Sequence, residues 1–141
     1  HAGSKKTNQT VAIKAENIYN LINSMIFHVF GENMSSIRKT ISVTEQQDEF
    51  GFPKASQDLE PIWTYSFERW GQVKADHYTD SLFSAFGELA NSSKLAISCD
   101  HIRVGYRFCR EGKHVVYFKM TVYGIAIIRI LHERMLPSLH L

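Results

Sequence analysis

Basic residues are concentrated in the last third of this 141-residue chain. From His101 onward there are seven lysines and arginines against two acidic residues, although the net charge of the whole chain is only +2. Cationic side chains can neutralise the charge that develops on a phosphate during phosphodiester cleavage. The candidates for that chemistry are Arg107, Arg110, Lys113 and Arg134. Such a reaction also needs a base and an acid, and the chain offers no convincing base.

The same cations could instead form a binding face for an acidic protein, an acidic peptide or a phosphate backbone. The candidates for this face are Arg103, Arg107, Arg110, Lys113, Arg129 and Arg134. The plainer alternative is a solvated sheet surface. Arg129 has a structural alternative of its own, because it lies inside a predicted strand and could pair with a helix carboxylate such as Glu68 or Asp80.

The sequence contains no motif for other kinds of catalysis or cofactor binding. There is no phosphate-binding glycine loop, nucleophile elbow, pair of metal ligands at a useful spacing or carboxylate dyad, so we expect no metal and no cofactor. Cys99 and Cys109 make neither a disulfide framework nor a zinc site. Apolar runs are too short to span a membrane. A reduced, cytoplasmic protein without a membrane segment is the simplest expectation.

The basic residues must be positioned by β-strands. Val104, Tyr106 and Phe108 alternate with polar residues, and two apolar runs follow at His114–Thr121 and Ile125–Leu131. These features predict three strands. The last two runs are apolar on both faces, which is typical of strands in a sheet covered by helices.

Two helices are predicted before the strands. Ser56 is a candidate N-cap followed by acidic residues, and an apolar face ends at Gly71. That face consists of Leu59, Ile62, Trp63, Phe67 and Trp70. Pro61 either starts the regular helix or kinks its first turn. A second helix from about residue 73 to residue 90 would complete an antiparallel hairpin.

The N-terminal third predicts three further elements. Apolar residues at helical spacing predict an amphipathic helix over residues 11–30, and alternation from Ile37 to Val43 predicts a short strand that could add to a sheet edge. Thr44 to Gln47 has the pattern of a capping box that opens a helix. Residues 50–54 can form only an edge strand or a lead-in, because Pro53 cannot donate a backbone hydrogen bond.

Sequence motifs in the C-terminal two thirds of the chain resemble those of a known family. The motifs are Arg-x-Gly-Tyr-Arg at 103–107, Gly-Lys-His-Val-Val-Tyr-Phe at 112–118, Gly-Ile-x-Ile-Ile-Arg-Ile-Leu-His-x-Arg-Met at 124–135 and Ile-Trp-x-Tyr-x-x-Glu-Arg-Trp-Gly at 62–71. They are similar to ParE-type toxins of the RelE/ParE superfamily over about residues 50–141, and residues 34–49 resemble the start of a ParD-type antitoxin. The resemblance implies an α+β fold in which a helical hairpin packs on a small antiparallel sheet.

Three segments follow from this comparison. Residues 1–10 are expected to be disordered or a cloning remnant, residues 11–49 to form an extension with a helix and a ParD-like strand, and residues 50–141 to form the toxin domain. The ParD-like stretch breaks off before the helices of a DNA-binding dimer, so we do not expect direct DNA binding.

The resemblance implies a function. ParE toxins are non-enzymatic bacterial proteins of type II toxin-antitoxin systems that poison DNA gyrase, block replication and stabilise plasmids or mobile elements. The partners would be DNA gyrase, bound by the cationic face, and a ParD-like antitoxin. The groove for the antitoxin, or for the chain's own N-terminal helix, would be lined by Trp63, Phe67, Tyr78 and Leu82. We also expect a homodimer, because the apolar stripe from Ile18 to Val29 needs to be buried.

Two alternatives remain open at this point. The first is an mRNA ribonuclease like the RelE branch, with Arg107, His132 and Arg134 as its catalytic residues. The second is an inactive fusion in which the N-terminal helix covers the groove of the toxin.

Overall fold

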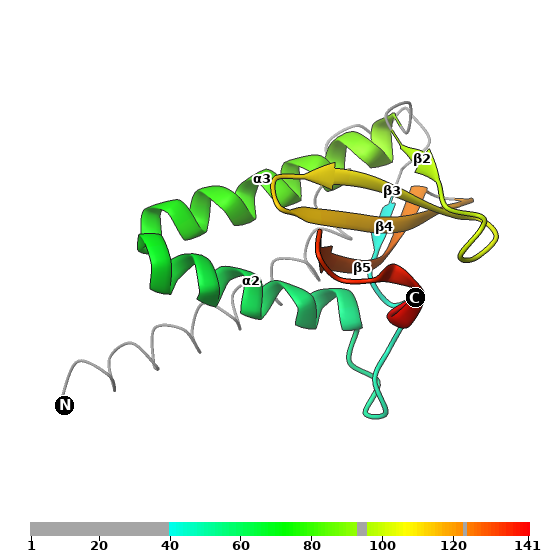
Figure 1. Ribbon diagram of the computed structural model, residues 1–141. Coiled ribbons are helices and arrows are strands. Elements are labelled where there is room, and N and C mark those ends of the chain that lie inside the picture. Colours follow the sequence, from blue (N-terminus) through cyan, green and yellow to red (C-terminus); the bar gives the residue numbers. More distant parts are fainter. Residues whose placement is uncertain (1–39, 93–95, 123) are drawn as a thin grey trace.

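Two helices lie on one face of a five-stranded sheet in the computed structural model, which describes residues 40–92, 96–122 and 124–141 (Figure 1). The helices are α2 (Lys54–Trp70) and α3 (Gln72–Asn91). The strands are β1 (Thr40–Ser42), β2 (Ile97–Ser98), β3 (Tyr106–Glu111), β4 (His114–Thr121) and β5 (Gly124–His132), and a 3-10 turn, η1 (Pro137–Leu139), follows them. The predicted α+β class and the helical hairpin are confirmed.

The sheet is mixed rather than purely antiparallel. Its strand order is β1-β5-β4-β3-β2, and β1 runs parallel to β5 while the other neighbours are antiparallel. The predicted edge strand around Ile41 therefore does add to the sheet of its own molecule. Ile41 and Val43 are buried in the main core, which explains why the alternating pattern holds this segment in place. The predicted helix at residues 11–30 lies outside the described residues.

No helix begins at Thr44, so the prediction from the capping-box pattern of Thr44 to Gln47 is wrong. These residues belong to a loop that leads to α2, and Gln47 makes only an isolated bridge to Pro53. Asp48 explains the difference, because its side chain accepts hydrogen bonds from the backbone N–H groups of Phe50 and Phe52. Such side-chain bonds to the local backbone compete with helix formation.

Helix α2 begins two residues before the predicted N-cap. Pro53 occupies the N-cap position, with φ −61° and no side-chain cap, and the first turn contains no acidic residue. Ser56 is instead a buried residue inside the helix, and its hydroxyl has no hydrogen-bond partner. The helix also continues through Pro61 rather than starting there. The predicted end at Gly71 is confirmed, since its φ of 89° suits a residue without a side chain.

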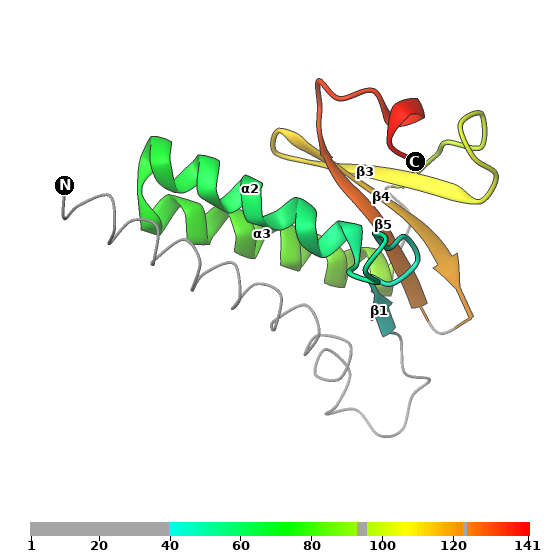
Figure 2. The same ribbon diagram turned by 90° about the horizontal axis from the view of Figure 1, so that it is seen from below.

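The sheet has an apolar core on each face. The larger core packs α2 and α3 against the sheet and includes Trp63, Leu82 and Phe118. The smaller core, on the other face, includes Tyr117 and Leu131. Strands β4 and β5 are therefore apolar on both faces, as predicted. Among the described elements, the α-helices α2 and α3 cover only one of these two faces. Leu141 packs on the second face, and Figure 2 shows the C-terminal segment across β5 from the helices.

Candidate functional site

The six candidate cations do not gather on one face of the sheet. Arg107 lies opposite Phe118 of the main core, whereas Arg110 lies opposite Val115 of the smaller core. Alternate residues of a strand point to opposite faces, so these two side chains leave β3 on different sides. Lys113 and Arg134 lie near one end of the sheet, where the backbone N–H of Glu133 donates to Lys113.

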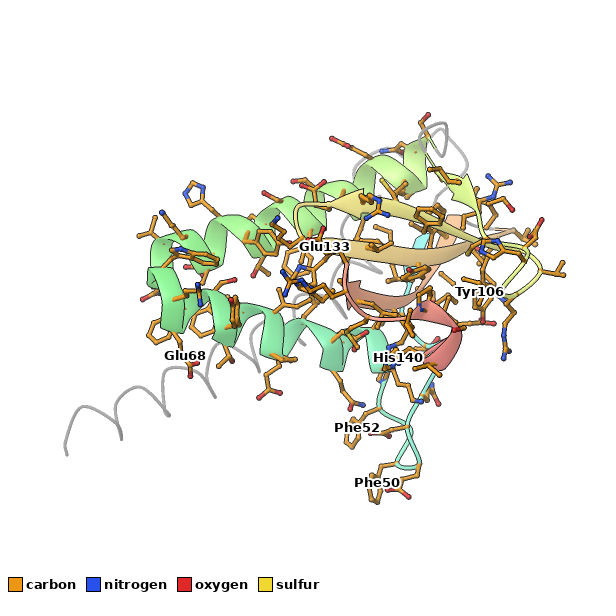
Figure 3. All side chains as sticks on the ribbon, viewed as in Figure 1. Phe50, Phe52, Glu68, Tyr106, Glu133 and His140 are labelled. Atoms are coloured by element: carbon orange, nitrogen blue, oxygen red, sulfur yellow. The ribbon has the colours of Figure 1, made fainter. Side chains whose placement is uncertain are left out.

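Arg103 contacts both the Tyr106 ring and the C-terminal segment. Its guanidinium lies 5.9 Å from the centre of the Tyr106 ring, and Nη2 is 3.5 Å from the carbonyl oxygen of Leu141. Figure 3 shows Tyr106 on the side of the molecule where the C-terminal segment lies. Arg103 remains exposed, so it can still contribute positive charge to a binding surface.

Arg129 is a structural residue. Its Nε and Nη2 donate to the two carboxylate oxygens of Asp58, each at 2.8 Å, and its Nη1 donates to the carbonyl of His140 at 3.3 Å. The Arg129 and Asp58 side chains are 14% and 13% exposed. The hydrogen bonds that Arg129 donates to the Asp58 carboxylate raise the pKa of Arg129 above its usual value. The expectation that Arg129 pairs with a helix carboxylate is therefore confirmed. The carboxylate is that of Asp58 in α2 and not that of Glu68 or Asp80.

The three residues of the ribonuclease alternative are not brought together. His132 Nδ1 accepts a hydrogen bond from the backbone N–H of Arg134 at 3.1 Å, so these two residues are neighbours. Arg107 lies on β3, two strands away from His132 on β5. The β3 residue in the same row as His132 is Glu111, and Arg107 is four residues, or roughly 13 Å, along the strand from it. The structure thus separates one proposed cation from the proposed proton carrier.

A half-buried polar cluster that the sequence did not indicate lies at this end of the sheet. Tyr78 Oη and His114 Nδ1 share a hydrogen bond of 2.5 Å, and Tyr78 Oη also accepts one from the backbone N–H of Lys113 at 3.0 Å. The His114 ring meets the His132 ring edge-on, with centroids 5.4 Å apart. Burial, with a smaller contribution from His132, lowers the pKa of His114 to about 4. Only the register of β4 and β5 could have indicated this pairing.

The predicted antitoxin groove is largely inside the core. Trp63 is 1% exposed and Leu82 is fully buried. Trp63 Nε1 donates to Asp76 at 3.0 Å, and Phe67 stacks on the Trp63 ring at 5.0 Å. Phe67 and Tyr78 are half-buried, so they are the members of this set with surface to offer.

Exposed aromatic residues form two separate features. The first, which we call the Phe loop, is the segment 47–53 with Phe50 and Phe52 at its end. The second, which we call the hairpin tip, lies where α2 meets α3. It contains Tyr65, Arg69, Trp70 and Val73. The large apolar residues of the two features are each more than half exposed: Phe50, Phe52, Tyr65, Trp70 and Val73.

Other kinds of site are not evident in the described parts of the chain. Within residues 40–92, 96–122 and 124–141, no group of three or more His, Cys, Asp or Glu residues is arranged to hold a metal ion. None of the helices described is long and apolar enough to cross a membrane. A shallow, polar hollow lies between α3 and the end of β3, and its lining includes Asp80, Glu88 and Glu111.

A small α+β domain with exposed cationic and aromatic surfaces is typical of proteins that act by contacting other macromolecules. The family model described as "ParE toxin of type II toxin-antitoxin system, parDE" matches residues 53–137, which is more than half of the chain. The chain belongs to this family of toxins. This finding confirms the resemblance to ParE toxins; the antitoxin-like character of residues 34–49 stays a prediction.

Named relatives agree with this assignment. The chain is 37% identical over 84 residues to Toxin ParE1 of Mycobacterium tuberculosis (strain ATCC 25618 / H37Rv), a match that covers 59% of this chain and 86% of that protein. It is 38% identical over 88 residues to Toxin ParE1 of Caulobacter vibrioides, covering 62% and 91%. A chain from the solved structure "Chromosomal ParDE TA system from P. aeruginosa" shares the fold, with a TM-score of 0.53, 18% identity and coverage of 69% and 98%.

Proposed function

We propose that this toxin acts in the cytoplasm by poisoning DNA gyrase, without enzymatic activity of its own, and that a ParD-like antitoxin neutralises it. The observation that carries the proposal is the family match over residues 53–137. Such a pair would stabilise the plasmid or mobile element that encodes it.

The cationic residues that remain exposed are the proposed contacts to the target. Arg103, Arg110, Lys113 and Arg134 are exposed, whereas Arg107 is half-buried and Arg129 is neutralised by Asp58. A complex of a protein with cleaved DNA presents phosphates and acidic side chains, and exposed cations favour association with such a surface. Lys113 and Arg134 are neighbours at one end of the sheet and are the best placed to act together.

The proposed antitoxin contact uses the accessible parts of Phe67 and Tyr78. These half-buried aromatic rings lie at the margin of the main core and are continuous with it. An antitoxin segment that packs on them would extend an existing apolar core rather than create a new one.

The test is a supercoiling and cleavage-complex assay with purified gyrase. The complete chain should inhibit supercoiling and accumulate cleaved DNA, and the double variant K113E/R134E should require at least about tenfold more protein, because it replaces attraction by repulsion at two positions. Lys54→Glu is a control variant, since it reverses one charge on a different part of the molecule.

If the 141-residue chain does not inhibit gyrase, one further variant must be tested. A chain beginning at Thr40 keeps β1, which the sheet needs, and removes the segment proposed to act in cis. Inhibition by this variant alone would identify residues before β1 as an inhibitor. If neither protein inhibits gyrase, the gyrase proposal is refuted.

A further inference from the structure

The Phe loop is held in one shape by its own hydrogen bonds. Asp48 Oδ1 accepts from the backbone N–H groups of Phe50 and Phe52, each at 2.9 Å, and Asp48 Oδ2 accepts from Gln57 Nε2 at 2.9 Å. The backbone N–H of Asp48 donates to the carbonyl of Phe52 at 2.9 Å, which closes the loop. The loop is therefore anchored to the first turn of α2.

This ordered loop presents two phenylalanine side chains to solvent. Phe50 is 76% exposed and Phe52 is 52% exposed, and both point away from the body of the molecule in Figure 3. The hydrogen bonds of the loop use only the backbone of these residues, so the fold does not require aromatic side chains here. Exposed aromatic groups on a preorganised loop are typical of an interaction surface.

The hairpin tip has the composition of a binding hot spot. The Arg69 guanidinium lies 5.7 Å from the centre of the Tyr65 ring and 5.8 Å from that of the Trp70 ring, and the two rings meet edge-on at 6.0 Å. Tyr65 is 56%, Trp70 53% and Val73 72% exposed. Tyrosine, tryptophan and arginine are the residues most enriched where binding energy is concentrated.

The two features complement each other but lie at opposite ends of α2. The loop carries Phe50 and Phe52 beside the acidic, exposed Glu49, whereas the tip carries aromatic rings around the cationic Arg69. A helix of this length spans about 25 Å, so the loop cannot reach the tip of its own protomer. Glu68, the residue before Arg69, lies on the same lower side of the molecule as Phe50 and Phe52 in Figure 3.

We propose that two copies of this chain form a dimer in which their α2 helices run antiparallel across a two-fold axis. The Phe loop of each protomer then packs on the hairpin tip of the other, and Glu49 lies near Arg69 of the partner subunit. The two contacts are identical by symmetry, so the assembly closes as a dimer and does not grow into a fibre.

The exposed area of the loop and tip residues approaches that of a typical stable interface. From their exposed fractions, the five apolar residues of loop and tip present about 600 Å² per protomer, against about 800 Å² in total for each partner of a typical stable interface. A contact between two Phe loops alone would bury less than this and would bring like charges together. Glu68 also lies at the tip and weakens the attraction for Glu49, which makes the aromatic contact the larger contribution.

The experiment is sedimentation equilibrium of the complete chain at several concentrations. The unsubstituted protein should be a dimer, and F50S/F52S should raise the dimer dissociation constant by about tenfold or more. Glu49→Lys and Arg69→Glu should each weaken the dimer, while E49K/R69E should recover most of the loss, because the pair is restored with reversed charges. Val122→Ser, at a residue that is 90% exposed on another part of the molecule, should leave the dimer unchanged.

Three results would overturn the proposal. They are a monomeric unsubstituted protein, a dimer that F50S/F52S does not weaken, and the absence of recovery in E49K/R69E. A dimer insensitive to these changes would instead point to the apolar stripe from Ile18 to Val29, or to another surface. All substitutions are at exposed positions, and thermal unfolding of each variant separates loss of dimer from loss of fold.

Discussion

Replacement of Asp58 by alanine is expected to destabilise the protein more than the loss of any exposed ion pair. Asp58 accepts two hydrogen bonds from Arg129 and a third, at 2.9 Å, from the backbone N–H of Ile130. Asp58→Ala leaves both donors without this acceptor, and the Arg129 side chain is only 14% exposed. Removing one partner of a buried ion pair costs about 3–5 kcal/mol, a large fraction of the roughly 5–15 kcal/mol that stabilises a domain.

Urea unfolding followed by tryptophan fluorescence measures this loss directly. The control is Glu133→Ala, which removes the ion pair with Lys113 at 3.7 Å, where the two side chains are 35% and 76% exposed. That change should cost less than about 1 kcal/mol, because exposed pairs contribute little. The double variant D58A/R129M should be more stable than D58A, since the unpaired buried charge is also removed.

Two outcomes would refute this reasoning. One is a loss below about 1 kcal/mol for Asp58→Ala, which would mean that solvent screens the pair as it does at the surface. The other is a double variant no more stable than D58A, which would mean that the unpaired charge is not the source of the cost.

Two further predictions concern the end of the sheet near Tyr78. Gly112 has a φ of 58°, and a Cβ atom there would lie 2.6 Å from the Tyr78 ring, so Gly112→Ala should cost about 1–3 kcal/mol in thermal unfolding. The control is Gly105→Ala, which should cost less because a Cβ atom at Gly105 meets no neighbour. Equal losses of stability in the two variants would contradict a steric origin. Burial lowers the pKa of His114 from 6.5 to about 4, so the unfolded state binds a proton there more readily than the folded state between these values. Stability should therefore fall by about 1–2 kcal/mol, allowing for solvent screening, as the pH drops from 6.5 to 4, and His114→Phe should remove that part of the loss. An NMR titration that gave His114 an ordinary pKa would refute the assignment.

The sequence was sufficient to predict the elements whose pattern is local. The periodic apolar residues of α2 and α3, the glycine between them, and the runs that became β4 and β5 each carry their own signal, because helix and strand periodicity is read within one segment. The family motifs lie in these same elements, and so the family could be recognised from them.

Local signals failed where two elements compete or where a partner is distant. The capping-box pattern after Thr44 and the N-cap pattern at Ser56 both occur, but Asp48 and Pro53 give the backbone a better alternative. Val104 fits the alternating pattern of a strand, yet it is 85% exposed in the loop before β3.

The sequence by itself determined the helical hairpin, the three C-terminal strands and membership of the ParE family. Only the tertiary structure decided that β1 pairs in parallel with β5, that Arg129 is neutralised by Asp58, and that the candidate cations face different sides of the sheet. Arg129 and Asp58 are 71 residues apart in sequence, and their contact exists only because the packing of α2 on the sheet brings α2 and β5 together. Pairings of this kind depend on strand register and helix packing, which no single segment encodes.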